Sequence, residues 1–407
     1  MAELLLVTTR WPYGPVTEFL DREILHLARA FDVVRVAPMR PVGTLRSGLP
    51  PNLVVDESLA HAISPDIPVV GRKSRQITGA RNLFRRRPTK ASLPASSTAD
   101  LYSLSWWREA ALNRADATGV YQWAAWRTRP DVAYTFWLSS ATLGLRNAWP
   151  QVPLVSRAHG GDVYAYAYGW QTIPQQDQQL AATNWVACAS QNGRDYLSNR
   201  FPHMRDRFST RYLGVHDLGG LAQPSGGDAL RVLSASSIDQ NKRVSLIAEC
   251  LVSMARAGQR IEWTHLGDGP DRDRVSSVLR QGSAGLETTF PGHVELSSVH
   301  DQMLNGRYDV FVNLSKSEGL PVTIMEAQCV GLPVVATAVG GTSEVADPRL
   351  NELVSPSPTV AEVSNAILRA KARDRADASH RRARWERYFN SEINYENFAR
   401  ELADMIR

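Results

Sequence analysis

Two carboxylates bracket a short apolar run in the second half of the chain. Glu318 and Glu326 stand at the ends of EGLPVTIME, which also contains Pro321. Because proline is tolerated in the first turn of a helix, we expect a helix to begin close to Pro321. Glu318 then lies on the loop before the helix, and Glu326 lies about one turn inside it. Between the two acids we expect a helix N-terminus with free backbone N–H groups.

Basic residues and glycines follow upstream segments that are typical of strands. Lys242 and Arg243 come after SASSIDQN, and Gly267 lies in LGDGP. Ligands of open α/β sheets bind at the carboxyl ends of the strands, so we expect these loops to share one site with Glu318 and Glu326. Basic side chains and free helix N–H groups suit a diphosphate, whereas the carboxylates suit hydroxyl groups. A nucleotide sugar carries all of these groups.

The composition is that of an ordinary globular protein. The 407 residues are enough for two or three domains, and 43% are hydrophobic. A net charge of +5, spread along the chain, does not by itself predict nucleic-acid binding. Three widely spaced cysteines, an N-terminal apolar run too short for a signal peptide, and no run of about 18 apolar residues predict a reduced, cytoplasmic protein.

Short apolar runs alternate with amphipathic segments along most of the chain. One series starts with ELLLVTT and TEFLDREILHLARAF, and a second starts with LRVLSASS and RVSLIAECLVSMARAG. This alternation predicts an α/β fold of two Rossmann-like, doubly wound domains. We predict a first domain at residues 1–215, a hinge at 216–228, a second domain at 229–385, and a C-terminal helix at 386–407 that crosses back to the first domain.

One segment departs from this alternation. Residues 71–90 carry eight Lys or Arg and no acid, and a Ser-, Ala- and Pro-rich stretch extends the insertion to about residue 100. One interpretation is a solvated insertion, because charge runs usually are solvated. The other is a patch, Arg72–Lys90, that binds an anionic lipid or a phosphorylated acceptor, with the protein peripheral at the inner face of the membrane.

The run EGLPVTIMEAQCVGLPVVATAVGGTSEV closely resembles the E-x7-E signature of retaining glycosyltransferases of family 4 (glycosyl transferases group 1). The resemblance extends to four more segments: TRWPYGPVTEFLDREI, SRAHGGDVY, SASSIDQNKRVSLI and FPGHVE. It implies the GT-B fold, in which two Rossmann-like domains face each other across a cleft. It also implies that the N-terminal domain holds the acceptor and that the C-terminal domain holds the nucleotide sugar.

The resemblance implies a role for each matching residue. Glu318 holds hydroxyls of the donor sugar, Lys242 neutralises the leaving diphosphate, and His159 touches the donor sugar from the opposite domain. Glu326 accepts hydrogen bonds from the ribose. The remaining implied donor contacts lie mostly on backbone groups: Gly14, Gly267, Val294, Gly319, Leu320 and Val322.

One position departs from the family pattern. Members usually carry an Arg five residues before the phosphate-binding Lys, and this chain has Ser237 there. Loss of an Arg fork should weaken diphosphate binding. We hypothesise that Arg243, beside Lys242, substitutes for it.

The implied reaction transfers a sugar from a UDP- or GDP-type donor to an acceptor hydroxyl, with retention at the anomeric carbon and without a metal or cofactor. The acceptor is a glycan, a lipid-linked glycan or a small molecule, with polysaccharide, glycolipid or natural-product synthesis as the setting. A nucleotide-sugar epimerase on the same scaffold and a catalytically degenerate partner subunit remain as alternatives. A dinucleotide dehydrogenase is disfavoured, because no G-x-G-x-x-G follows the first predicted strand.

Overall fold

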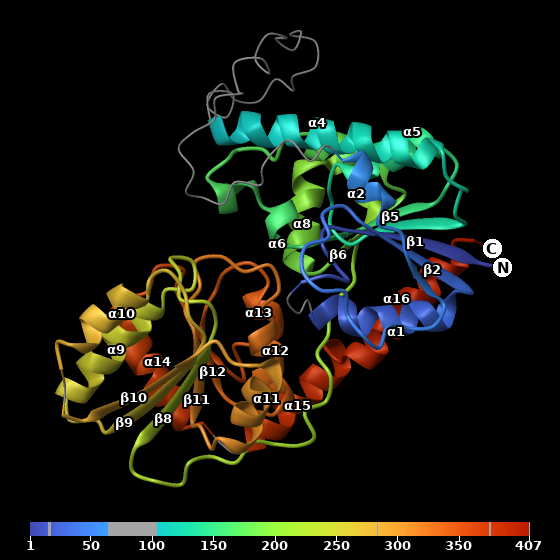
Figure 1. Ribbon diagram of the computed structural model, residues 1–407. Coiled ribbons are helices and arrows are strands. Elements are labelled where there is room, and N and C mark those ends of the chain that lie inside the picture. Colours follow the sequence, from blue (N-terminus) through green and yellow to red (C-terminus); the bar gives the residue numbers. More distant parts are fainter. Residues whose placement is uncertain (15–17, 64–103, 283, 374–375, 407) are drawn as a thin grey trace.

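The structure is a computed structural model that describes residues 1–14, 18–63, 104–282, 284–373 and 376–406. Within these residues the chain forms two parallel sheets, each with its own helices, which we call the N-lobe and the C-lobe (Figure 1). The patch Arg72–Lys90 lies outside the described residues, so its membrane or acceptor contact stays a prediction.

The N-lobe sheet has seven strands in the described residues, in the order β3-β2-β1-β4-β5-β6-β7. Its central strands are mostly buried and apolar, as expected of strands covered on both faces, although β5 also buries Ser156 and Arg157. The strands are β1 (Glu3–Thr8), β2 (Val33–Pro38), β3 (Leu53–Val55), β4 (Val132–Thr135), β5 (Leu154–Ala158), β6 (Trp185–Cys188) and β7 (Phe208–Thr210). The α-helices are α1 (Glu18–Ala30), α2 (Ser58–Ala62), α4 (Leu104–Ala125), α5 (Ala141–Ala148), α6 (Gly160–Val163), α7 (Gln176–Ala182) and α8 (Gln191–Arg200).

The C-lobe sheet repeats this plan with six strands in the described residues, in the order β10-β9-β8-β11-β12-β13. The strands are β8 (Leu230–Ala235), β9 (Ile261–Leu266), β10 (Leu286–Gly292), β11 (Val310–Asn313), β12 (Val334–Thr337) and β13 (Glu352–Val354). The helices are α9 (Val244–Arg256), α10 (Arg272–Leu279), α11 (Leu296–Asn305), α12 (Val322–Cys329), α13 (Thr342–Val345) and α14 (Val360–Lys371). Both predicted series of alternating strands and helices are therefore confirmed.

The chain crosses between the lobes twice, and the two crossings pair with each other. Val215 donates to the carbonyl of Phe389 (3.0 Å), and Ser391 donates to the carbonyl of Val215 (3.1 Å). The second crossing joins α15 (Ala376–Tyr388) to α16 (Ser391–Asp404), so the predicted limit at residue 385 falls inside α15. Helix α16 packs on α1 and contributes buried side chains to the N-lobe core, as predicted for a helix that crosses back (Figure 1).

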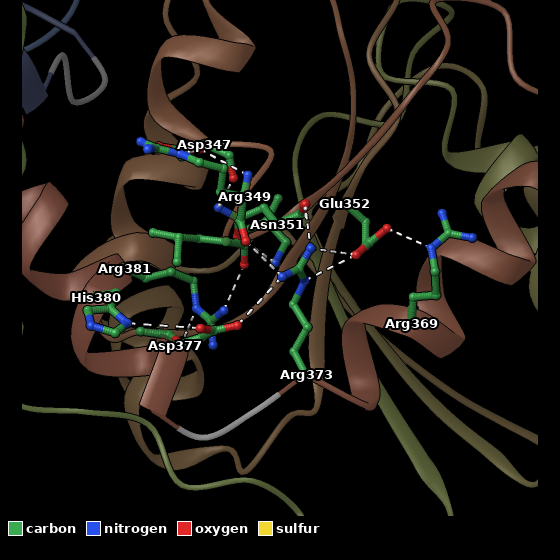
Figure 2. A network of polar contacts seen from close by, with 12 residues as sticks. Asp347, Arg349, Asn351, Glu352, Arg369, Arg373, Asp377, His380 and Arg381 are labelled. Carbon is green, nitrogen blue, oxygen red and sulfur yellow. Dashed lines mark hydrogen bonds and ion pairs between the residues drawn. The ribbon is translucent and has the colours of Figure 1, made fainter.

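Polar networks hold this crossover at both ends. In the N-lobe the fully buried pair Arg157–Glu23 (2.8 Å) lies under α16, with the Arg157 guanidinium 4.1 Å from the ring centre of Phe398. In the C-lobe, Arg373 after α14 bonds Glu352 of β13 and pairs with Asp377 of α15 (Figure 2). These contacts tie the start of α15 to the edge of the C-lobe sheet.

Candidate active site at the contact between the lobes

The loop between β11 and α12 has the predicted form. Helix α12 begins at Val322 with Pro321 at its N-cap, Glu318 lies on the loop, and Glu326 lies one turn inside the helix. Gly340 explains how the loop is packed, because a Cβ on Gly340 would lie 1.7 Å from the carbonyl oxygen of Glu318. The glycine at the end of β12 therefore makes room for this loop.

Glu318 and Lys242 form the first charged pair of the site. The Lys242 Nζ lies 2.7 Å from Glu318 Oε1, and the two side chains are 26% and 11% exposed. The loop after β8 positions Lys242, because Asp239 accepts hydrogen bonds from the backbone N–H groups of Lys242 and Asn241. Burial raises the pKa of Asp239, but these N–H donors outweigh it and keep the pKa below its usual range. The pair presents a cation and an anion side by side.

Glu326 belongs to a second pair. It is 1% exposed, and its Oε1 lies 2.9 Å from His300 Nε2 on α11. The ring of His216, on the linker between the lobes, packs against His300 with centroids 4.8 Å apart. Burial lowers the pKa of His216 to about 4. Nothing in the spacing of the sequence singled out either histidine, because His300 reaches Glu326, and His216 reaches His300, only through tertiary packing.

The loop after β5 brings His159 to the same place from the N-lobe. A Cβ added to Gly160 would lie 2.8 Å from Gly319 Cα, so the two loops touch backbone to backbone. The His159 ring packs on Phe136 and Trp137, with centroids 5.0 and 4.3 Å away. Among the described residues, neither ring nitrogen of His159 has a hydrogen-bond partner. The structure thus brings His159 to the Glu318–Lys242 loops.

Asp162 holds this loop in shape. It accepts hydrogen bonds from the backbone N–H groups of His159 and Leu138, which lie at the ends of two neighbouring strands. Asp162 is the third residue after the N-cap of α6, so its side chain closes the start of that helix.

A further residue that sequence analysis missed joins the two lobes here. Glu344 on α13 accepts hydrogen bonds from the backbone N–H groups of Gln191 (2.6 Å) and Asn192 (2.7 Å), at the N-terminus of α8. A carboxylate is favourable there because the N–H groups of the first turn carry partial positive charge. Figure 1 shows α8 and α6 of the N-lobe over α13 of the C-lobe. The run that ends in GGTSEV contains Glu344, but its partner Gln191 lies 153 positions away in the sequence.

Arg243 is engaged elsewhere. Its guanidinium donates to the carbonyls of Leu314, Ser315 and Pro356, and burial lowers its pKa. A phosphate would have to compete with these three bonds. The hypothesis that Arg243 replaces the missing arginine therefore stays a prediction without support from this geometry, whereas its contacts give it a role in holding the loop after β11.

The other predicted donor contacts lie on loops around the C-lobe sheet, with Gly14 in the N-lobe. Ser237 is exposed and donates to Asp239 (2.8 Å). Gly267 requires glycine, because its φ is +139° and a Cβ would lie 1.9 Å from the carbonyl oxygen of Ser236. Leu320 is 8% exposed, Val294 and Val322 pack on the same core, and Gly14 packs against Gly43. Their contacts to a donor stay predictions.

Solved structures share this architecture over nearly the whole chain. The apo form of the lipopolysaccharide outer core galactosyltransferase WaaB aligns with a TM-score of 0.68 at 13% identity, covering 97% of this chain and 98% of that one. Anabaena Alr3699/HepE in complex with UDP aligns with a TM-score of 0.65 at 16% identity, covering 99% and 100%. The fold is GT-B. The predicted fold class is therefore confirmed, with two Rossmann-like lobes.

Sequence comparisons also relate this GT-B chain to glycosyltransferases, and the family match lies in the C-lobe. The family model described as Glycosyl transferases group 1 matches residues 229–372. The amylovoran biosynthesis glycosyltransferase AmsK of Erwinia amylovora is 28% identical over 191 residues, which are 44% of each chain. The aligned region spans less than half the length of the first curated relatives that it matches.

The described residues of the GT-B chain contain neither a membrane-spanning helix nor a cluster of metal ligands. None of its described helices is both long and apolar enough to span a bilayer. In the same part of the chain, no group of three or more His, Cys, Asp or Glu is arranged to hold a metal ion. The three cysteines are unpaired and buried, as expected of small core thiols. Independence from a metal stays a prediction.

Proposed function

We propose that the protein is a retaining glycosyltransferase that moves a sugar from a UDP- or GDP-type donor to an acceptor hydroxyl in bacterial polysaccharide, glycolipid or related glycan synthesis. The observation that carries this proposal is the contact between the loops of Glu318 and His159, with Lys242 on Glu318. Two findings support it: the group 1 match of the C-lobe, and relatives and neighbours whose names include amylovoran biosynthesis, lipopolysaccharide outer core and UDP.

In the proposed mechanism, the C-lobe binds the donor. The free N–H groups at the start of α12 and the Lys242 ammonium meet the diphosphate, so the leaving-group charge is stabilised by groups that are in place before reaction. The carboxylate of Glu318 accepts hydrogen bonds from hydroxyls of the transferred sugar. Glu326, buried beside His300, accepts hydrogen bonds from the ribose.

The N-lobe completes the reaction centre. The bond from the anomeric carbon to the diphosphate oxygen breaks, and a bond to the acceptor oxygen forms on the same face. The proton of the acceptor hydroxyl passes to the leaving diphosphate, so the step needs no separate general base. Lys242 and the N–H groups of α12 stabilise the diphosphate in place of a metal. His159 lies against the transferred sugar, where positive charge develops. Closure of the two lobes excludes water and limits hydrolysis of the donor.

The test is a thermal-shift screen of UDP, GDP, ADP, CDP and dTDP, followed by product analysis with the sugar nucleotides of the base that stabilises the protein. Ligand binding raises the melting temperature by mass action, so one base should stand out. NMR of the product should show the anomeric configuration of the donor. No stabilisation by any nucleotide, or full activity in both Glu318→Ala and Glu326→Ala, rejects the proposal. No specific observation favours the epimerase or the partner subunit.

A further inference from the structure

Exposed aromatic side chains gather next to the His159 loop. Trp137 is 38% exposed, and Tyr166 and Tyr168, on the 3-10 helix η3 (Ala165–Tyr168) directly after α6, are 52% and 49% exposed. Their neighbour Tyr164 is 1% exposed, so packing in the core accounts for Tyr164 but not for the other three. Single exposed apolar side chains are common on protein surfaces, whereas a group around one functional loop indicates a binding surface.

Two of these rings lie within reach of the proposed reaction centre. The Trp137 ring packs directly on His159, with centroids 4.3 Å apart. A Cβ added to Gly161 would lie 3.2 Å from the Tyr168 hydroxyl, so Tyr168 borders the loop two residues beyond His159. Tyr168 also stacks on Trp170 with centroids 4.8 Å apart and an angle of 22°, which supports its ring from one side. Trp137 and Tyr168 therefore both border the loop in which Gly160 meets Gly319.

The chemistry of this surface selects among acceptors. Sugar rings present a flat face of C–H groups with hydroxyls at the edge. A tyrosine or tryptophan ring matches this pattern, because it has an apolar face and a hydroxyl or indole N–H group at its edge. A bare lipid chain would instead be matched by aliphatic side chains, whereas all three exposed apolar side chains beside this loop are aromatic.

We propose that Trp137 and Tyr168 form a stacking platform for a saccharide acceptor, so that the group receiving the sugar is itself a sugar ring. This inference rests on the proposed function, because it places the acceptor beside His159. The platform is on the N-lobe, whereas the diphosphate-binding groups are on the C-lobe. Substitutions of Tyr168 should therefore separate acceptor binding from donor binding.

The experiment is saturation-transfer-difference NMR on the full chain with saturating UDP or GDP, whichever binds. The probes are methyl glycosides of hexoses, N-acetylhexosamines and 6-deoxyhexoses, together with glycerol as a non-saccharide. We expect ring C–H protons of at least one glycoside to be saturated, and glycerol not to be. Tyr168→Leu should weaken glycoside binding about tenfold, while Tyr168→Phe keeps most of it because the ring face remains. Tyr121→Leu, an exposed tyrosine on α4, is the matched control.

The outcomes separate this inference from the proposed function. If the Tyr168→Leu variant binds glycosides as tightly as the unchanged protein, the proposed platform is contradicted. It is also contradicted if the protons of none of the glycosides are saturated. In both cases normal binding of the nucleotide leaves the proposed function intact. An unchanged protein that binds no nucleotide diphosphate instead contradicts the proposed function. Nucleotide binding by Tyr168→Leu, measured by the same thermal shift, verifies that this variant is folded.

Discussion

The two lobes bring different chemistry to their contact. The C-lobe side carries two carboxylates, each with a close polar partner: Glu318 with Lys242 and Glu326 with His300. The N-lobe side carries a histidine set among aromatic rings, His159 with Phe136 and Trp137. Under the proposed function, the diphosphate is recognised on the C-lobe and the acceptor ring on the N-lobe. A change on one side should therefore affect one substrate more than the other.

The largest effect is expected for Lys242→Ala. In the proposed mechanism this change removes the cation that meets the leaving diphosphate, so turnover should fall about 10²- to 10³-fold, the usual effect of losing one preorganised group. Initial rates with the identified donor check this. Lys316→Ala, an exposed lysine on the same side of the C-lobe, is the matched control and should keep normal rates. Unchanged turnover of Lys242→Ala would contradict the proposal that Lys242 stabilises the leaving diphosphate.

Glu326→Ala should come next, and its effect should fall on donor affinity. Loss of a buried carboxylate that accepts hydrogen bonds weakens binding by roughly 1.5–3 kcal/mol, or about 10- to 100-fold in Kd. Calorimetry with the nucleotide diphosphate measures it, with the exposed Glu287→Gln of β10 as control. Glycoside binding at the N-lobe should be unchanged in Glu326→Ala. An equal loss of glycoside binding would contradict separate binding of donor and acceptor by the two lobes.

Glu344→Gln should have a smaller effect that involves both lobes. The two hydrogen bonds to the N-terminus of α8 hold the lobes in the arrangement in which Glu318 and His159 meet, and weakening them should lower the fraction of molecules in that arrangement. We expect the donor KM to rise about 5- to 10-fold, with a modest change in turnover. Glu362→Gln is the matched control, because Glu362 accepts from the backbone of Ser355 within one lobe. Equal effects of the two changes would exclude a specific role between the lobes.

The remaining prediction concerns stability and not catalysis: a pH dependence of stability should arise in the C-lobe and the adjoining linker. Burial lowers the pKa of His216 and of His265 to about 4, so between pH 4 and about 6.5 the unfolded chain binds more protons than the folded one. The free energy of unfolding should therefore be highest above pH 6.5 and fall as the pH drops through this window. Urea unfolding of His216→Phe should show a shallower fall. The exposed His203→Asn should behave like the unchanged protein, and an unaltered slope in His216→Phe would contradict the assignment.

Local features were predictable because they depend on neighbouring residues. The alternation of apolar runs and amphipathic segments predicted both sheets, and Pro321 predicted where α12 begins, which placed Glu318 on a loop and Glu326 inside the helix. The contacts of the Arg243 side chain, by contrast, could not be predicted from its neighbours in the sequence. Its position beside Lys242 indicated a phosphate contact, whereas its length and fork let it bond three carbonyls on other loops.

By itself, the order of residues determined the elements, their sequence along the chain and the types of side chain at each strand end. Only the tertiary structure decided which of these side chains meet: Lys242 with Glu318 across 76 positions, Glu344 with the start of α8, and Gly160 with Gly319. The reason is physical, since hydrophobic periodicity is a local property. Contacts between distant loops depend instead on strand order, on the crossover of α16 and on how two separately built lobes pack together.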